Sequence, residues 1–249
     1  MGVSATAGGF SSAAGNSIRQ TPFFARAAVG RLAELARFGE GQKAARVLNV
    51  EAGSGILTGQ LARAGLRCWA LDSRFAMAQE LRRCLPQVAV CSATALAIPL
   101  SSSSIDMFCV GFADDSLPTQ FDPAEAHRVL RTGGAWVQVW NELDESVPWV
   151  QEWLALLADS PTVAERSSRV LNQPEGFSDP AEESFANPLR SSVEDAIEKF
   201  RGGAEVSVMP VATQTALLRK ANELLVSQVD AQAVLQLPLQ TSLSYSRAI

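Results

Sequence analysis

VLNVEAGSGILT, residues Val47–Thr58, is the stretch of sequence that decides the fold. The run Arg46–Val50 has the length and apolar character of a buried strand, and an apolar helical pattern covers Ile56–Ala64. Gly53 and Gly55 lie between the two and allow the backbone to turn tightly. A turn of this kind brings the chain close to a ligand and directs the first N–H groups of the helix toward it. The segment therefore predicts a strand, a glycine-containing binding turn and a helix.

The alternation of short apolar runs and helical patterns continues as far as Trp140. Further strands are expected at Arg67–Leu71, Val88–Cys91, Ile105–Val110 and Ala135–Trp140, and further helices at Arg74–Cys84 and Pro123–Arg131. This spacing predicts an α/β fold with a doubly wound, mostly parallel sheet and helices on both of its faces. Ligands of such sheets bind at the carboxyl ends of the strands. Asp72 lies there, about 20 residues after the glycine turn, where an acid can accept both hydroxyls of a ribose.

The pattern changes after Glu142. Helices are expected at Val147–Asp159, Ser191–Arg201 and Thr213–Val229, with a long connection rich in Pro, Ser and Glu at Ser160–Pro188. Trp149 and Trp153 share one helix face, which favours a packing role for both indoles. The last segment, Val234–Ser246, alternates like a strand, and its Pro238 favours the edge of a sheet or a bulge. We expect this strand to close one edge of the sheet.

Composition excludes several classes of function. The chain has 249 residues, 47% of them hydrophobic, and its 21 Lys and Arg against 26 Asp and Glu give a net charge of −5. With that balance and no dense basic run, we expect no nucleic-acid partner. His127 is the single histidine, which argues against catalytic triads and multi-histidine metal sites, so no metal is expected. The chain has no Cys-x-x-Cys pair, and we expect its cysteines to be small apolar residues in a reducing compartment. The cysteines are Cys68, Cys84, Cys91 and Cys109.

The N-terminal residues carry two features typical of targeting. MGVSAT fits the myristoylation pattern with Gly2 as acceptor, which is a weak signal because one acyl chain anchors poorly. Residues 1–33 hold no acid, and their basic residues are Arg19, Arg26 and Arg31. Such a composition resembles a mitochondrial transit segment. No stretch has the ~18 apolar residues of a membrane-spanning helix. We expect a soluble, intracellular protein, in the mitochondrial matrix or otherwise in the cytoplasm.

Taken together, these motifs resemble the class I S-adenosylmethionine-dependent methyltransferases, in the small-molecule branch called type 11. VLNVEAGSG is similar to the family's VLDVGAGTG loop, LDSRFAMAQ to its second-strand acid and following helix, and SSSSIDMFCV to its fourth strand with a buried Asp106. HRVLRTGGAWVQVWN resembles the helix, Gly-Gly turn and fifth strand, and DESVPW follows as in close relatives. The resemblance covers essentially the whole chain. It implies a seven-stranded sheet, a single domain over residues 25–249, and an extension over residues 1–24 that includes the start of a lid helix.

The chain departs from the family pattern at the cofactor loop, which is therefore degenerate. Glu51 replaces the first glycine of the loop, whose lack of a side chain lets the backbone approach the methionine part of the cofactor. Asn49 replaces the acid of the first strand, and Ser92 replaces the acid that usually receives the adenine amino group. The implied cofactor-binding set, vestigial or weak, is Asn49, Glu51, Gly53, Gly55, Asp72 and Ser92.

The retained residues also have a structural interpretation. Gly53 and Gly55 fit a tight strand-to-helix turn that needs no ligand, and Asp72 suits the start of the following helix as well as it suits a ribose. Asp114 and Asp115 lie where a general base could face a methyl acceptor, but neighbouring acids are more often a solvated turn. We therefore assign no catalytic residue.

Two functions remain open. We favour a methyltransferase-like protein that has lost turnover, binds S-adenosylmethionine weakly or not at all, and acts as a structural or interaction subunit of a larger assembly. The alternative is an active enzyme that uses S-adenosylmethionine to methylate a small carboxylate or hydroxyl acceptor, in which positioning dominates catalysis. Partner subunits are expected because the Gly-, Ser- and Ala-rich residues 1–24 bury little apolar surface alone.

Overall fold

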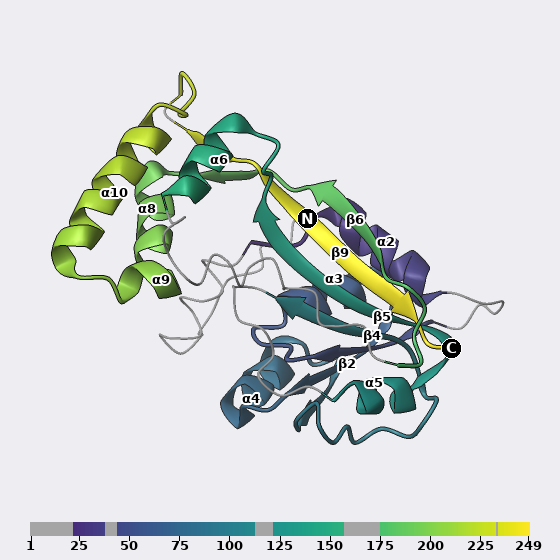
Figure 1. The fold of residues 1–249 in the computed structure, drawn as a ribbon. Coiled ribbons are helices and arrows are strands. Elements are labelled where there is room, and N and C mark those ends of the chain that lie inside the picture. The colour runs from purple at the N-terminus through teal and green to yellow at the C-terminus, as the bar shows by residue number, and fades with distance from the viewer. Residues whose placement is uncertain (1–21, 38–43, 113–121, 157–174, 233) are drawn as a thin grey trace, which may run out of the picture.

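Seven strands form one sheet through the middle of the molecule (Figure 1). A computed structural model describes residues 22–37, 44–112, 122–156, 175–232 and 234–249. Within these residues the strand order is β3-β2-β1-β4-β5-β9-β6. The strands are β1 Arg46–Val50, β2 Arg67–Asp72, β3 Ala89–Ser92, β4 Ile105–Phe112, β5 Leu130–Leu143, β6 Ala181–Ala186 and β9 Leu239–Arg247. A separate two-stranded ribbon consists of β7 Leu189–Ser191 and β8 Leu235–Leu237.

The five strands from β3 to β5 in this order are parallel. Val47 of β1 stands opposite Cys68 of β2 on one side and Met107 of β4 on the other. The C-terminal strand β9 runs antiparallel to both β5 and β6. The parallel pairing of β1 with β2 and the doubly wound, mostly parallel fold class are therefore confirmed.

Helices cover both faces of the sheet because successive strand residues point to opposite sides. In β1, Val47 joins the apolar cluster on one face and Leu48 joins the cluster on the other. The first cluster contains residues of α2, α3 and α4, and the second contains residues of α5. These helices are α2 Arg26–Ala36, α3 Ile56–Arg63, α4 Phe75–Cys84 and α5 Pro123–Val129. The two clusters fix the sheet and so position the carboxyl ends of its strands.

The edge of the sheet differs from the sequence prediction. Val234–Ser246 does not close the sheet, because β6 is the edge strand and β9 lies inside it. β6 falls within Ser160–Pro188, which the sequence predicts to be a connection, because most of its side chains are exposed and show no apolar alternation. Pro238 separates β8, which pairs with β7, from β9. Proline donates no N–H, so a change of pairing partner is expected at this position.

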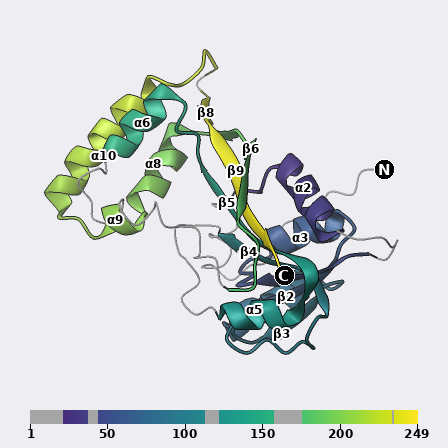
Figure 2. The same ribbon diagram turned by 45° about the vertical axis from the view of Figure 1, so that its right-hand side comes forward.

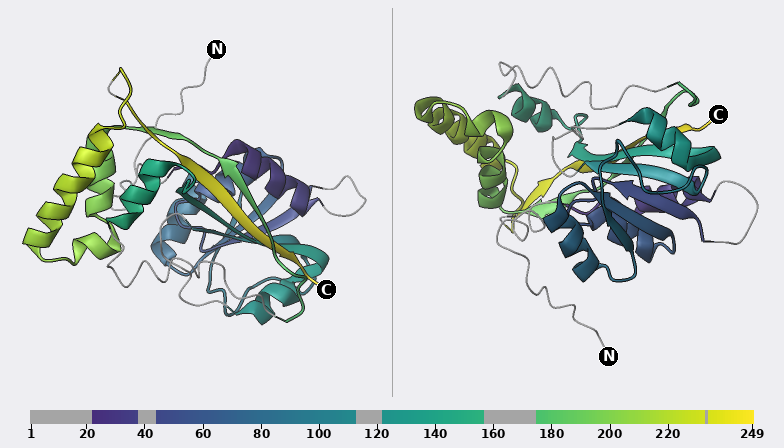
Figure 3. Two further views of the ribbon diagram at one scale, coloured as in Figure 1. Left: turned by 45° about the horizontal axis from the view of Figure 1, so that its top comes forward. Right: turned by 90° about the horizontal axis from the view of Figure 1, so that it is seen from below.

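In the described part of the chain, four helices form a lobe at the end of the long strands β5 and β9, to one side of the sheet (Figures 1 and 3). They are α6 Pro148–Ala155, α8 Val193–Arg201, α9 Ala204–Ser207 and α10 Val211–Val226. The lobe has apolar clusters of its own, in which the Trp153 ring packs on Phe200 with centroids 4.5 Å apart. Trp149 packs against a cluster that includes Leu225 and Leu235. The packing role expected of both tryptophans is confirmed.

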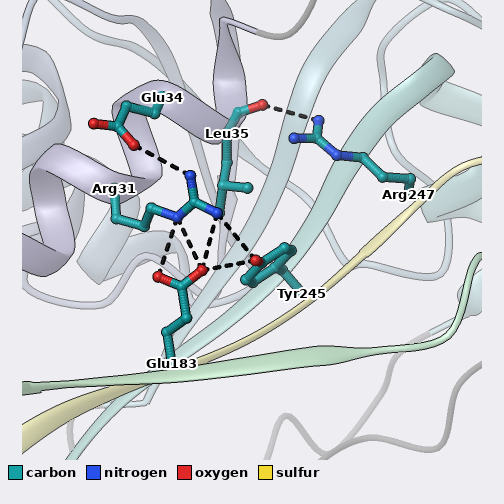
Figure 4. A network of polar contacts seen from close by, with 6 residues as sticks. All are labelled: Arg31, Glu34, Leu35, Glu183, Tyr245 and Arg247. Carbon is teal, nitrogen blue, oxygen red and sulfur yellow. Dashed lines mark hydrogen bonds and ion pairs between the residues drawn. The ribbon is translucent and has the colours of Figure 1, made fainter.

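Helix α2 lies beside β6 and β9 (Figure 2), and a polar network fastens it to these strands (Figure 4). Arg31 donates from Nε to Glu183 Oε1 of β6 at 2.9 Å and from Nη2 to Tyr245 Oη of β9 at 3.1 Å. Tyr245 Oη donates in turn to Glu183 Oε1 at 2.7 Å. On the same helix, the Leu35 carbonyl accepts a hydrogen bond from Arg247 Nη1 at 3.0 Å. Helix α2 is thus an integral part of the sheet's outer layer.

This placement changes the interpretation of the acid-free residues 1–33. Arg26 and Arg31 lie in α2, whose Ala28 and Leu32 are fully buried, so both arginines belong to the folded domain. A transit segment covering all 33 residues is incompatible with that helix. Gly2, Arg19 and the rest of residues 1–21 lie outside the described residues, so the extent of the extension stays a prediction. No helix among the described residues is both long and apolar enough to cross a membrane.

Candidate functional site

The turn after β1 lies at the carboxyl edge of the parallel strands. Three of its residues have left-handed backbone, Glu51 at φ 49°, Gly53 at φ 54° and Gly55 at φ 80°. Glycine adopts these angles freely, whereas a residue with a side chain pays about 1 kcal/mol or more in strain. Gly55 N donates to Ala52 O at 2.9 Å, and Ala52 N donates to Leu71 O of β2 at 3.0 Å. These bonds fix the shape of the turn and hold Glu51 in a conformation that favours glycine.

The two glycines of the turn have different surroundings. A Cβ added to Gly55 would lie 2.4 Å from Leu81 Cδ2 and 3.0 Å from Leu85 Cδ1, so α3 and α4 pack closely only with glycine here. Among the described residues, a Cβ added to Gly53 would have no neighbour nearer than the Glu51 carbonyl oxygen, at 3.8 Å. Gly55 therefore fits the structural interpretation, and Gly53 is the glycine that leaves room at the edge of the sheet.

Asp72, the last residue of β2, uses both of its carboxylate oxygens, and its side chain is fully buried. Oδ2 accepts hydrogen bonds from Gly53 N at 2.8 Å and Arg74 Nη2 at 3.2 Å. Oδ1 accepts hydrogen bonds from Arg74 N at 3.0 Å and Arg74 Nε at 3.1 Å. A carboxylate offers about four lone-pair positions, so these four donors take up its capacity. Asp72 thus binds the turn, the start of α4 and the Arg74 guanidinium together.

A second carboxylate, Glu51, lies close to Asp72. Burial and the negative charge of Asp72 raise the pKa of Glu51 above its ordinary value of 4.5. The positive charge of Arg74 and a hydrogen bond with Ser73 lower the pKa of Glu51, but they do not cancel the upward shift. This cluster therefore combines two acids and one guanidinium before any ligand arrives.

Asn49 and Ser92 complete the set of predicted cofactor-binding residues. Asn49 is 2% exposed and donates from Nδ2 to Thr58 Oγ1 of α3 at 2.8 Å, so it joins β1 to α3 inside the core. Ser92 ends β3, stands opposite Asp72 in the strand register and is exposed. The carboxyl edge thus gathers five of the six predicted residues, and Asn49 is the one that lies in the core; the five are Glu51, Gly53, Gly55, Asp72 and Ser92.

The residues before α2 cover the neighbouring part of this edge. The Phe24 side chain is 4% exposed, and its Cζ lies 3.6 Å from the point where a Cβ would stand on Gly111 of β4. Gln60 of α3 holds the Phe24 backbone, because its Oε1 accepts from Phe24 N at 3.1 Å and its Nε2 donates to Phe24 O at 2.8 Å. Asn187 Nδ2 donates to the Phe23 carbonyl at 2.8 Å. An apolar ring therefore fills the space above the end of β4.

The other residues singled out in the sequence contribute no further site. Asp114 and Asp115 lie outside the described residues. His127 packs edge-on against Phe177 with ring centroids 5.4 Å apart. All four cysteines are free, and burial raises the pKa of Cys68 to about 12. Among the residues that the structure describes, no group of three or more His, Cys, Asp or Glu could hold a metal ion.

Arg74 is the member of the site that the sequence interpretation missed. It follows Asp72 by two residues, and an arginine so close after an acid at the end of a strand can fold back onto that acid. That spacing is a weak signal, because the same residue can as easily extend into water.

Comparison with known proteins identifies the domain. Residues 48–137 match the type 11 methyltransferase domain family. This match covers fewer than half of the residues and supports a domain similar to the class I S-adenosylmethionine-dependent methyltransferases of the type 11 branch. An uncharacterized methyltransferase of Mycobacterium tuberculosis is 40% identical over 109 residues, which are 44% of this chain and 45% of the relative. An uncharacterized methyltransferase of Schizosaccharomyces pombe is 26% identical over 183 residues, 72% of this chain and 73% of the relative.

The methyltransferase fold extends over most of the chain. A solved structure from Anaeromyxobacter dehalogenans, assigned as a type II methyltransferase, covers 91% of this chain and 96% of its own with a TM-score of 0.63 and 23% identity. At that identity the likeness shows the fold alone. The match to the mycobacterial methyltransferase spans less than half of that protein. The family resemblance read from the motifs is confirmed.

S-adenosylmethionine is the cofactor of this methyltransferase family, and the residues at the carboxyl edge do not fit it in their present arrangement. A ribose needs free acceptor positions, whereas those of Asp72 are taken by four donors. Glu51 places a side chain and an acid where the family has a glycine. Gly53 retains the open surroundings that close approach of a ligand requires.

Proposed function

We propose that this methyltransferase-like protein has lost turnover and acts as a structural or interaction subunit of a larger assembly. The observation that carries the proposal is the saturated carboxylate of Asp72, which Arg74 and the glycine turn occupy on both oxygens. A cofactor that bound here would have to displace charge-assisted hydrogen bonds before it gained its own. S-adenosylmethionine therefore binds weakly or not at all.

The charge of Glu51 supports the same conclusion. Its raised pKa means that this environment already disfavours a carboxylate, and the cofactor carries a carboxylate of its own. Two like charges ~4 Å apart at an effective dielectric constant of ~20 repel by about 4 kcal/mol, or roughly a thousandfold in affinity. A glutamate at this position of the loop is thus a strong obstacle to cofactor binding.

The helical lobe supports an interaction role. Val208 and Val211, at the junction of α9 and α10, are 82% and 78% exposed. Contiguous exposed apolar patches mark protein-binding surfaces, and these two valines are proposed to belong to such a patch. The partners proposed are other protein subunits, with the mitochondrial matrix as the proposed compartment and the cytoplasm as the alternative. Hydrogen exchange of residues 1–24 tests partner docking, because protection that is equal in the isolated chain and in the native assembly contradicts it.

An active methyltransferase is the second candidate. Similarity to the family favours it, as does the survival of Gly53 and Asp72 at the carboxyl edge. In this alternative S-adenosylmethionine donates its methyl group to a small carboxylate or hydroxyl acceptor, and the chain contributes by aligning the two. Arg74 would first have to release Asp72.

Calorimetric titration of the full chain with S-adenosylmethionine tests the proposal. The wild type is expected to show no binding in the micromolar range, and Glu51→Gly is expected to gain affinity because it removes both the charge and the side chain. Glu51→Gln is the matched control, since it removes the charge and keeps the bulk. Micromolar binding by the wild type would overturn the loss of turnover and favour the active enzyme.

A further inference from the structure

Arg74 lies where the ribose of a nucleoside would meet Asp72. We propose that its guanidinium is a latch on the nucleoside site, which competes with the two ribose hydroxyls for Asp72 and swings away before a nucleoside binds. The inference rests on the proposed function, which treats this edge as a degenerate cofactor site, and it names the side chain that keeps the site closed.

The hydrogen bonds of Asp72 define what the latch blocks. The guanidinium takes one position on each carboxylate oxygen, through Nε to Oδ1 at 3.1 Å and Nη2 to Oδ2 at 3.2 Å. The other position on each oxygen accepts a backbone N–H, from Arg74 on Oδ1 and from Gly53 on Oδ2. Two vicinal hydroxyls need one position on each oxygen, which is the pair that the guanidinium holds.

The two backbone donors cannot leave without disrupting the fold. The turn that contains Gly53 is held to β2 by the hydrogen bond from Ala52 N to Leu71 O. The Arg74 backbone is fixed because its carbonyl accepts from Met77 N and Ala78 N in the first turn of α4, at 3.0 and 3.1 Å. The Arg74 side chain, in contrast, is 61% exposed. Rotation about its side-chain bonds frees Asp72 and leaves the turn and the helix intact.

The latch also covers the open glycine of the turn. A Cβ placed on Gly53 would lie 3.9 Å from Arg74 Nη2, so the guanidinium lies beside the surface that a nucleoside has to approach. Its positive charge also acts on Glu51 and lowers the pKa of that carboxyl. Removal of Arg74 alone would therefore leave two acids facing each other. A clean test replaces Glu51 first, so that Asp72 is the one acid left in the cluster.

The test is calorimetric titration of the full chain with S-adenosylhomocysteine, a nucleoside without the sulfonium charge. Glu51→Gly is compared with Glu51→Gly/Arg74→Met and with Glu51→Gly/Arg74→Lys. Arg83→Met in the same background is the matched control, because Arg83 lies on α4 and pairs with Glu80 at 2.7 Å, away from Asp72. The Arg74→Met change is expected to lower Kd by on the order of tenfold, and Arg83→Met is expected to leave it unchanged. Arg74→Lys, which keeps the charge and loses the two-point contact, is expected to give an intermediate Kd.

Equal or weaker binding after Arg74→Met overturns the latch, and so does the absence of nucleoside binding in both Arg74 variants. Urea unfolding shows whether each variant is folded, and Arg74→Lys decides the question if the Met variant is not. Micromolar binding of S-adenosylmethionine by the wild type would contradict the proposed function. The latch would still be tested by the ratio of the Kd values for S-adenosylhomocysteine with and without the Arg74 substitutions. The two proposals therefore fail separately.

Discussion

Two arginine–carboxylate clusters in this protein use the same chemistry to different ends. Arg31 reaches from α2 to Glu183 and Tyr245 on two outer strands, and joins segments far apart in the sequence. Arg74 folds back on Asp72, two residues before it, so that this pair lies within one short segment. Arg31 and Glu183 are about equally exposed, at 33% and 32%, whereas Arg74 is 61% exposed over a fully buried Asp72.

The difference indicates which pair the fold needs. The Arg31 cluster holds a helix on the sheet, so its loss is expected to reduce the free energy of unfolding. In the second cluster Asp72 is structural, because it satisfies two backbone N–H groups, whereas the side chain of Arg74 is 61% exposed. Loss of the Arg31 cluster should therefore lower stability and leave nucleoside binding unchanged. Loss of the Arg74 side chain should change nucleoside binding and leave stability nearly unchanged.

Asp72→Ala is expected to have the largest effect. It leaves the N–H groups of Gly53 and Arg74 without their acceptor and removes the side chain that fixes the start of α4. We expect the free energy of unfolding to fall by about 2–3 kcal/mol. Urea denaturation measures this, with Asp195→Ala at the start of α8 as an exposed control. A loss no larger than that of the control would contradict the structural role of Asp72.

Glu183→Ala should have a smaller effect confined to stability. Loss of the hydrogen bonds from Arg31 and Tyr245 is expected to reduce the free energy of unfolding by about 1–2 kcal/mol. Affinity for S-adenosylhomocysteine in the Glu51→Gly background should stay the same. A change in that affinity would mean that the Arg31 cluster and the glycine turn are coupled. It would contradict the claim that the Arg31 cluster contributes to stability alone.

Substitution of each arginine by methionine sharpens the contrast. Arg31→Met should reduce the free energy of unfolding by about 1 kcal/mol, because its three polar partners belong to three elements. Arg74→Met should change it by less than about 0.5 kcal/mol, since most of that side chain is in water. Parallel urea titrations decide the point. An Arg74 variant as unstable as the Arg31 variant would show that the latch is part of the fold.

The pH dependence of stability should have opposite signs in the two clusters. The pKa of Glu51 is raised by burial and Asp72, so its penalty exists at neutral pH and disappears as pH falls through the raised pKa. The pKa of Glu183 is lowered by hydrogen bonds from Arg31 and Tyr245, so its contribution is complete above about pH 4.5 and is lost as pH falls through the lowered pKa. These opposite pH dependences of stability can be tested by replacing each glutamate with glutamine.

Glu51→Gln should accordingly be more stable than the wild type at pH 7, with an advantage that shrinks toward acid pH. Glu183→Gln should be less stable at pH 7 and approach the wild type at strongly acid pH. Urea midpoints of the two variants and the wild type across pH 3–7 measure both trends. The same direction of change in both variants would refute the assigned electrostatics.

The sequence predicted the parallel half of the sheet well because buried strands are apolar and glycine turns are explicit. It missed β6, whose AEESFA carries no apolar alternation because it forms an exposed edge. In the site, the sequence predicted Glu51, Gly53 and Asp72 together but treated Gly53 and Gly55 alike. Only the packing of Leu81 against Gly55 separates the two glycines.

The sequence pattern alone could not predict the role of Arg74. Its sequence position allows the guanidinium to extend into water or to fold back on Asp72, and the choice depends on the backbone conformation between β2 and α4. Asn49 is a similar case, since its place in the first strand suggests a ligand contact while its amide is used by Thr58 in the core. Local geometry, not residue type, decides both roles.

The side-chain Nε–H signal of Arg74 gives the most direct test of whether this chain occupies its own nucleoside site. In ¹⁵N-labelled Glu51→Gly protein, Arg74→Met assigns the signal by its disappearance, and S-adenosylhomocysteine is then added to saturation. In the free protein we expect the signal to be protected from solvent exchange, because Arg74 Nε donates a hydrogen bond to Asp72, and we expect that protection to be lost when the nucleoside binds. A nucleoside that binds while the Arg74 signal keeps its position and its protection would contradict it.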